Sequence, residues 1–338
     1  MFIIGLLLLA GCRSAMPTST LQRFEFTSPH MGTLFSISLY AQDQTSAEAA
    51  AQAAFRRVNQ LEDIMSDYQA DSELMRLCEQ PTGRPVPVSA DLFTVFECGQ
   101  KISGITDGAF DVTVGPYVRL WRFARKKKVL PTTAELASAA ASTGYKNLRL
   151  DSRARTATLL APNMRLDLGG IAKGYAADEA LKILKRRGIS RALVAASGDI
   201  AIGAPPPGQT GWKVAISSID DVTNGVARTA LLRNAGISTS GDTEQFIEIG
   251  GIRYSHILDP ATGLGLTKRI QATVIARDAT TTDAMATAIC VLGTPRGLAV
   301  VDSLPHAAAV ILTKDGGRQQ ALVSRRFHWT TERQRRIH

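Results

Sequence analysis

One stretch in the middle of the chain combines a carboxylate, two glycines and a lysine in a pattern suited to an anion. It reads Leu-Asp-Leu-Gly-Gly-Ile-Ala-Lys-Gly-Tyr-Ala-Ala-Asp and covers residues 166–178. The pattern predicts a strand that ends at Asp167, a turn at Gly169 and Gly170, and then a helix. Glycines let a ligand approach the backbone, free N–H groups at a helix start favour phosphate, and Lys173 adds a positive charge. The spacing differs from that of a P-loop. Taken alone, the stretch at 166–178 indicates either a phosphate site or an ordinary turn with a surface lysine.

A second polar stretch opens a predicted helix over residues 282–292, where Thr281 or Thr282 is expected to cap the helix. Asp283 and Thr287 are four residues apart, so they share one face of this helix. A carboxylate and a hydroxyl suit a hard cation such as Mg²⁺, which prefers oxygen ligands. An aspartate at this position can also simply compensate the helix dipole.

A third stretch, residues 254–263, predicts a strand that runs into a turn at Asp259 and Pro260. His256, one of five histidines in the chain, lies at the end of this strand. A histidine there can act as a general base near neutral pH. Taken alone, it can equally be a structural residue with its hydrogen bonds satisfied.

The N-terminus resembles the signal of a bacterial lipoprotein. Residues 1–11 carry no charge, and their apolar run is too short to span a bilayer as a helix. The run ends Leu-Ala-Gly-Cys, which is similar to a lipobox, so we expect Cys12 to be lipidated and residues 13–21 to form a tether. This predicts a protein anchored in the bacterial cell envelope, facing the periplasm, at the inner or outer membrane. The alternative is a plain secretion signal with an incidental cysteine.

Three further cysteines remain if Cys12 carries lipid, in a compartment that permits disulfides. Cys290 falls in an apolar helical run and is expected in the core. Cys78 and Cys98 could pair, which the sequence leaves open. No spacing of cysteines and histidines indicates zinc.

The composition is that of a globular protein. The chain has 338 residues, of which 45% are hydrophobic and 20% charged, and this excludes a disordered protein. The formal charge is +9, and basic residues cluster at 122–128 and over 325–338, which is a predicted basic tail. We expect both runs to be solvated surface, and the lysines that begin at Lys126 to mark a loop. Charge alone, without a motif, does not favour nucleic acid as a partner.

The apolar pattern predicts a mixed α+β fold with largely antiparallel sheets. Gly250 and Gly251 separate two short strands and predict a tight hairpin. The long alternation of helix and strand that is typical of a doubly wound nucleotide fold is absent. Helices are expected at residues 47–65, with Ser89 as a cap at 89–102, and at 131–141, 171–186, 282–292 and 295–303. Strands are expected at residues 33–40, 191–196, 212–216, 244–249, 252–257 and 270–276.

These three polar stretches, in this order, resemble the ApbE-type FAD:protein FMN transferases. Further matches to that family lie at 31–33 (Met-Gly-Thr), 65–68 (Met-Ser-Asp-Tyr), 71–74 (Asp-Ser-Glu-Leu), 107–113 (Asp-Gly-Ala-Phe-Asp-Val-Thr), 197–200 (Ser-Gly-Asp-Ile) and 240–242 (Ser-Gly-Asp). Each motif is weak alone, but eight or more in register from about Met31 to about Leu312 make chance agreement implausible.

The resemblance implies two intertwined lobes within residues 22–324, with an FAD cleft between them. It implies Mg²⁺-dependent transfer of FMN from FAD to a Thr or Ser hydroxyl of a target protein, with release of AMP. His256 would be the base for that hydroxyl, with Asp242 or Asp283 as the alternative. The Gly170 carbonyl, Asp283 and Thr287 would hold Mg²⁺. The residues that would contact FAD are Met31, Tyr68, Ala109, Phe110, Asp111, Asp167, Lys173 and Ile257.

Two departures from the family pattern concern the same sites. Position 67 is Asp where Thr is commoner, and residues 280–282 are all Thr, so a further acidic metal ligand of some members is missing. Two other functions fit the same residues: an FAD pyrophosphatase that releases FMN and AMP, and a flavin-binding lipoprotein without catalysis.

Overall fold

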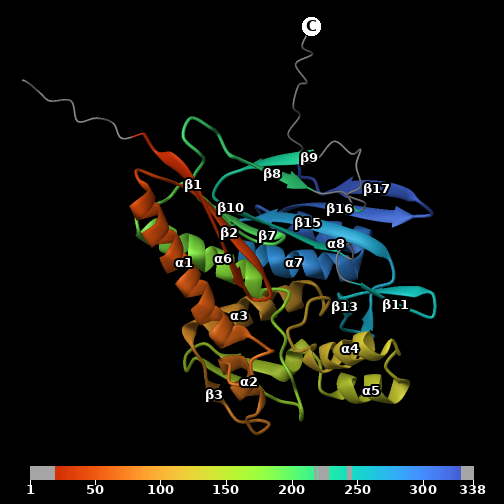
Figure 1. The fold of residues 1–338 in the computed structure, drawn as a ribbon. Coiled ribbons are helices and arrows are strands. Elements are labelled where there is room, and N and C mark those ends of the chain that lie inside the picture. The colour runs from red at the N-terminus through yellow and green to blue at the C-terminus, as the bar shows by residue number, and fades with distance from the viewer. Residues whose placement is uncertain (1–19, 217–218, 220–227, 242–245, 329–338) are drawn as a thin grey trace, which may run out of the picture.

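A computed structural model describes residues 20–216, 219, 228–241 and 246–328. Its centre is an eight-stranded sheet in the order β1-β2-β6-β7-β10-β15-β16-β17, in which every neighbouring pair is antiparallel (Figure 1). The four smaller sheets of the described residues, β3-β5-β4, β8-β9, β11-β12 and β13-β14, are antiparallel too.

The helices are α1 (Gln44–Met65), α2 (Glu73–Cys78), α3 (Ala90–Ile105), α4 (Gly115–Lys127), α5 (Thr133–Ala141), α6 (Ala172–Arg186), α7 (Ala279–Leu292) and α8 (Thr294–Ser303), with a short 3₁₀ turn at Tyr145–Asn147. The strands are β1 (Gln22–His30), β2 (Thr33–Ala41), β3 (Val86–Pro87), β4 (Leu148–Asp151), β5 (Thr156–Leu159), β6 (Ala192–Ala196), β7 (Asp199–Ile202), β8 (Trp212–Ile216), β9 (Arg228–Leu232), β10 (Ala235–Gly241), β11 (Phe246–Ile249), β12 (Ile252–Ser255), β13 (Leu258–Asp259), β14 (Leu264–Gly265), β15 (Arg269–Ala276), β16 (Ala308–Asp315) and β17 (Arg318–Val323).

The large sheet is covered on both faces because its strands bury alternate residues on opposite sides. In β16, Ala309 and Ile311 belong to the main core, whereas Val310 and Leu312 pack on the other side with Trp212 of β8. Helices α1, α6 and α7 cover the first face, and the β8-β9 ribbon covers the second (Figure 1). The helix face of the sheet therefore carries α6 and α7, the two helices with the polar motifs.

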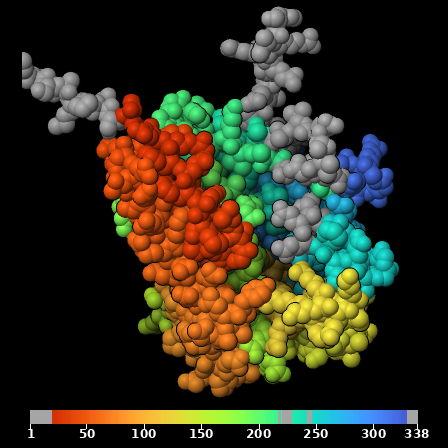
Figure 2. All heavy atoms as spheres, in the orientation of Figure 1, coloured from red at the N-terminus to blue at the C-terminus, as the bar shows by residue number. Residues whose placement is uncertain are grey.

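A separate apolar cluster holds α4 and α5 against the strands β11 to β14, and Figure 2 shows these elements together at the lower right, in yellow and cyan. Tyr117 and Trp121 of α4 lie in this cluster beside Tyr254 and Leu258. The Trp121 indole N–H donates to the Gly263 carbonyl over 2.7 Å. Helix α4 is thereby fixed to the β13-β14 turn, next to the stretch that contains His256.

The structure confirms the predicted fold class, a mixed α+β fold with antiparallel sheets. It confirms Ser89 as the cap of α3, since its hydroxyl accepts from the Leu92 N–H. It also confirms the hairpin between β11 and β12, where Gly250 and Gly251 both have positive φ. All six predicted helices are present with ends that differ by at most three residues.

Three local predictions were wrong. Helix α4 continues through Lys126 to Lys127, where a loop was predicted, because Lys and Arg are good helix formers and favour a helix C-terminus. Helix α7 begins earlier than predicted, and the carboxylate of Asp278 caps it in place of Thr281 or Thr282. Arg122 was predicted to be solvated, but its side chain is 30% exposed and forms ion pairs.

The cysteines of the described residues are free thiols, so Cys78 and Cys98 are not joined. Burial raises the pKa of the Cys98 thiol to about 11, and it raises that of Cys78 as well. Cys290 lies in the core, as predicted. Among the helices that the structure describes, none combines the length and apolar character needed to cross a membrane. Cys12 and most of the predicted tether lie outside the described residues.

Candidate functional site

The predicted anion-binding lysine lies between two buried carboxylates. The Lys173 ammonium is 2.8 Å from Asp199 Oδ2 and 3.6 Å from Asp283 Oδ2, and it donates to the Gly169 carbonyl over 3.2 Å. The side chains of Asp199 and Asp283 are only 5% and 2% exposed, whereas Lys173 is 27% exposed. The ammonium is therefore the more exposed partner of two carboxylates that water scarcely reaches.

The charges of this group perturb one another. Burial and, next, the nearby negative charge of Asp199 together raise the pKa of Asp283 to about 7, although Lys173 and the Gly174 N–H oppose the shift. Burial disfavours the Lys173 ammonium, but the carboxylates of Asp283 and Asp199 outweigh that effect, so the lysine pKa is raised. Two carboxylates with one ammonium leave this group short of positive charge, which favours a further cation.

The close crossing of α6 and α7 brings Lys173 and Asp283 together. The Gly174 N–H donates to Asp283 Oδ2 over 3.0 Å, so the metal-ligand candidate on α7 is bonded to the first turn of α6. In the other direction, the Asp178 carboxylate of α6 accepts the backbone N–H groups of Ala279 and Thr280 at the start of α7. Each helix thus supplies a hydrogen-bond partner to the other, and the two motifs are held as one unit.

Oxygen atoms that could bind a metal lie one turn further along α7. Thr287 Oγ1 lies 3.2 Å from Ser240 Oγ, and a Cβ placed on Gly170 would be 3.2 Å from the same Thr287 oxygen. The Gly170 backbone therefore lies close to Thr287, and a side chain at this position would crowd the threonine. The described residues hold no cluster of three or more His, Cys, Asp or Glu side chains suited to a metal. Asp283, Thr287 and a backbone carbonyl fit Mg²⁺, which binds through one or two carboxylates and completes its shell with water and substrate phosphate.

A second polar group lies on the other side of Gly169. Asp167 Oδ1 accepts the Gly169 N–H over 2.9 Å, while the Gly169 carbonyl accepts from Lys173. Asp167 Oδ2 is 3.6 Å from an Arg122 nitrogen, and the same nitrogen is 2.5 Å from Asp67 Oδ2. Burial raises the pKa of Asp167 to about 6, with the negative charge of Asp67 as the next cause. One residue, Gly169, therefore links the two polar groups, through its N–H on one side and its carbonyl on the other.

Tyr68 belongs to this second group and is 81% exposed, although it is aromatic. The Arg122 guanidinium lies over its ring, 4.0 Å from the centroid. An exposed aromatic ring fixed in this way can stack on a planar ligand.

Other predicted FAD contacts are buried below the site. Ala109, Phe110 and Asp111 are less than 10% exposed, and a ring carbon of Phe110 would be 3.2 Å from a Cβ on Gly170. Asp111 accepts from both the backbone N–H and the hydroxyl of Thr113, and burial raises its pKa. Met31 lies at the tip of the β1-β2 hairpin, where it adopts a φ of 49° and packs against the main core.

His256 is exposed in the turn between β12 and β13, while its neighbour Ile257 is 5% exposed and belongs to the main core. The structure thus supports a buried position for Ile257 and a solvent-facing position for His256. The partners of Lys173 and Asp283 in ion pairs and hydrogen bonds are Asp199, Gly169 and Gly174, so His256 is not one of them. Asp242, the alternative base, lies outside the described residues.

Three members of the site were not assigned a role from the sequence. Asp199 and Ser240 lie in motifs that match the family, whereas Arg122 lies in the basic run. Asp199 follows Ser197, which adopts a φ of 57° in the tight turn between β6 and β7. The Ser-Gly-Asp motif could have indicated this aspartate, because a strained turn that presents a carboxylate marks functional sites. No local signal identifies Arg122, whose partners are 55 and 45 residues away in the chain.

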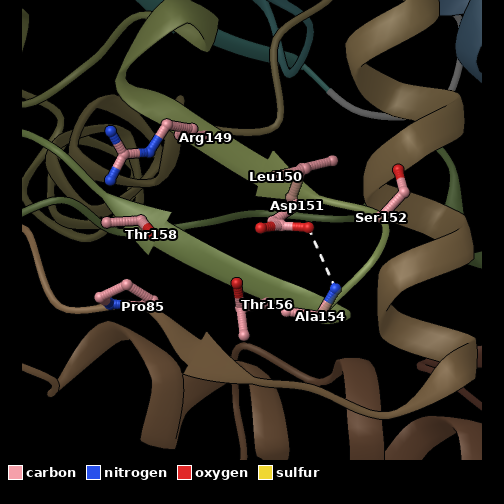
Figure 3. A pocket seen from close by; sticks show the side chains of 8 residues that line it. All are labelled: Pro85, Arg149, Leu150, Asp151, Ser152, Ala154, Thr156 and Thr158. Carbon is pink, nitrogen blue, oxygen red and sulfur yellow. Dashed lines mark hydrogen bonds between the residues drawn. The ribbon is translucent and has the colours of Figure 1, made fainter.

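A pocket lies away from these residues, on the three-stranded sheet β3-β5-β4 (Figure 3). It holds about 520 Å³, and Arg149, Asp151, Thr156 and Thr158 line its polar side. In Figure 3 the Asp151 carboxylate points to the Ala154 N–H, which it accepts over 3.0 Å. None of the predicted site residues lines this pocket, so it has no part in the site described here.

Known proteins share both the sequence and the fold. The ApbE family matches residues 31–312. The chain is 32% identical to the FAD:protein FMN transferase of Vibrio cholerae, over 93% of each chain, and 34% identical to that of Salmonella typhimurium, over 92% of this chain and 91% of the relative. The solved flavin transferase ApbE from Vibrio cholerae superposes with a TM-score of 0.81 at 31% identity, covering 90% of this chain and 98% of that one. The chain belongs to the ApbE family.

Proposed function

We propose that this chain transfers FMN from FAD to a hydroxyl group of a target protein and releases AMP. The observation that carries the proposal is the position of Lys173, between the buried carboxylates Asp199 and Asp283, at the start of a helix beside Gly170 and Thr287. Relatives of the same length that are about one-third identical are FAD:protein FMN transferases, which supports the same activity here.

The residues of the site suit a pyrophosphate substrate. Lys173 presents an ammonium at the first turn of α6, where the positive end of the helix dipole also favours phosphate. We propose that Asp283, Thr287 and the Gly170 carbonyl hold Mg²⁺, which would neutralise charge on the two phosphates as the bond between them breaks. Asp199 holds Lys173 in place, and Tyr68 offers an exposed ring to a flavin or adenine.

In the proposed reaction, the oxygen of a target Thr or Ser forms a bond to the phosphorus of the FMN half. The bond from that phosphorus to the bridging oxygen breaks, and AMP leaves with that oxygen. The hydroxyl proton must go to a base, and we assign it to His256, which faces solvent where a target protein can approach. Asp283 is a poorer base, because a metal bound to it would compete for the same oxygen.

The test is incubation with FAD, Mg²⁺ and a candidate acceptor protein that carries an exposed Thr, followed by in-gel flavin fluorescence and chromatography of the nucleotides. We expect fluorescent acceptor and one AMP for each FMN attached. Free FMN with AMP, and no labelled acceptor, would instead identify an FAD pyrophosphatase. FAD that is bound and recovered intact would identify a flavin-binding protein without catalysis.

We also propose that residues 1–12 are a lipoprotein signal, that Cys12 is lipidated, and that residues 13–21 tether the enzyme to the cell envelope. The support is the Leu-Ala-Gly-Cys sequence that follows an uncharged apolar run. A lipid anchor at the N-terminus would leave the folded part facing the periplasm, where it can reach target proteins of the envelope.

A further inference from the structure

Arg122 is a positively charged residue of α4 that contacts Tyr68, Asp67 and Asp167. Its guanidinium lies 4.0 Å from the centroid of the Tyr68 ring. One of its nitrogens is 2.5 Å from an Asp67 oxygen and 3.6 Å from an Asp167 oxygen. The side chains of Arg122, Asp67 and Asp167 are 30%, 18% and 15% exposed, so these contacts are partly shielded from water.

The backbone beneath Tyr68 is held independently of Arg122. The Ser66 hydroxyl accepts the N–H groups of Tyr68 and Gln69, and the Ser66 carbonyl accepts from the Ser72 hydroxyl over 2.6 Å. Ser72 in turn caps α2. The loop after α1 is therefore ordered by its own hydrogen bonds, and the Tyr68 ring is the part whose direction remains to be set.

A guanidinium is planar, so it can lie flat on an aromatic ring while its N–H groups bind carboxylates at its edge. Arg122 meets both conditions at once, because Asp67 and Asp167 hold its edge while its face covers Tyr68. With the guanidinium on one face of the ring and the tyrosine still 81% exposed, the opposite face is available to a ligand.

The charges favour the same arrangement. Asp67 and Asp167 are close enough for the charge of Asp67 to disfavour ionisation of Asp167. FAD carries negative phosphates, so two uncompensated carboxylates beside its site would weaken its binding. Arg122 neutralises one of these charges without occupying the exposed face of Tyr68.

We propose that Arg122 is a positioning residue for FAD: it backs the Tyr68 ring, so that a planar ring of FAD stacks on the opposite face. The inference rests on the proposed function, in that FAD is taken as the ligand. Arg122 acts through Tyr68 in this arrangement, with Asp67 and Asp167 as the anchors of its guanidinium. The ring of FAD that stacks is either the isoalloxazine or the adenine, and separate ligands distinguish them.

The test is a double-mutant cycle with Arg122→Gln, Tyr68→Leu and the double variant, in which the dissociation constant of FAD is measured by calorimetry. We expect Arg122→Gln to weaken FAD binding about five- to tenfold when Tyr68 is present, because the ring is then no longer oriented before the ligand binds. In the Tyr68→Leu background we expect the same change to alter binding less than about twofold, because the partner is gone. An equal loss in both backgrounds would overturn the proposal, since Arg122 would then act on FAD directly or through the fold.

Arg125→Gln is the matched control, because Arg125 is an exposed arginine on the same helix and its loss removes the same charge. We expect Arg125→Gln to leave FAD affinity unchanged within a factor of two. An equal loss of FAD affinity in this control would show that the effect of Arg122→Gln comes from net charge alone. If Arg122→Gln lowers the unfolding temperature markedly, Asp67→Asn replaces it, since this change releases the guanidinium without altering α4. We then expect a two- to threefold loss of FAD affinity that again disappears with Tyr68→Leu.

Two further ligands identify the ring. FMN and AMP are titrated separately into the parent and Arg122→Gln proteins, and flavin fluorescence is recorded for FMN. Weaker FMN binding with weaker quenching supports isoalloxazine stacking, and weaker AMP binding supports adenine stacking. If neither ligand is affected, Tyr68 is not backed for stacking and the inference is wrong. If the parent protein binds neither FAD, FMN nor AMP, the proposed function itself fails, which is a different outcome.

Discussion

Gly174 lies where α6 crosses α7, and its replacement by alanine tests whether this crossing sets the geometry of the site. A Cβ on Gly174 would lie 2.2 Å from the Ala279 carbonyl oxygen and 2.8 Å from Asp283 Cβ. These are backbone and Cβ atoms, which no change of rotamer can move away. The helices must therefore separate by roughly 1 Å to regain contact distances of about 3.5 Å.

The expected cost follows from three effects on the free energy of unfolding. Overpacking of a core costs about 1 to 3 kcal/mol. The same separation weakens the Gly174 N–H bond to Asp283, and a hydrogen bond to a charged group contributes about 1.5 to 3 kcal/mol. Alanine regains about 1 kcal/mol of helix propensity. The net loss of about 3 kcal/mol lowers the unfolding temperature by about 6 °C, at about 2 °C per kcal/mol for a domain of this size.

Differential scanning calorimetry measures this change, and Gly104→Ala is the matched control. Gly104 is an exposed glycine of α3, and a Cβ placed on it meets nothing within 4 Å. The free energy of unfolding of that variant is expected to rise by up to about 1 kcal/mol. An unfolding temperature for Gly174→Ala within about 1 °C of the parent, which corresponds to a loss of only about 0.5 kcal/mol, would refute the reasoning. So would an equal loss in Gly104→Ala.

Asp283→Ala is expected to abolish FMN transfer while FAD binding measured by calorimetry largely survives, because a metal site with few protein ligands loses its carboxylate; unchanged turnover at saturating FAD would remove Asp283 from the site. His256→Ala is expected to lower the transfer rate by about 10²- to 10⁴-fold and to remove a rise in rate with pH in the neutral range; a variant that keeps this rise shows that the base is a carboxylate. Asp167 has a raised folded-state pKa of about 6, so the folded protein binds its proton more tightly than the unfolded chain, and its contribution to stability falls as pH rises from about 4 to 6. Asp167→Asn should therefore become more stable relative to the parent across that range in calorimetric scans, and a constant difference would contradict the shift. Cys12→Ala is expected to move the protein from the membrane fraction to the soluble fraction, since a lipidated cysteine is the proposed anchor; full retention after a salt wash would speak against it.

Local pattern was enough to predict the parts of the site that depend on neighbours in the chain. The spacing of Asp283 and Thr287 predicted a shared helix face, and both lie on α7. The two glycines before Lys173 predicted a turn into a helix, and α6 begins at Ala172. The hairpin at Gly250 and Gly251 was predictable for the same reason: turn geometry and helix periodicity are set within a few residues.

Contacts between distant segments were decided only by the tertiary structure. Lys173 contacts Asp199 because α6 packs on β7, the strand that begins with Asp199. No short sequence pattern contains the packing of a helix on a particular strand. Arg122 lies within a basic run that resembles a solvated surface, and it becomes a site residue because α4 packs against the loop that holds Tyr68. Burial, too, is a property of the assembled fold, and it raises the pKa of Asp283 from that of an ordinary aspartate to about 7. The sequence by itself therefore determined which side chains carry the chemistry on each element, whereas strand order and helix crossing decided which of them meet, because those contacts join residues far apart in the chain.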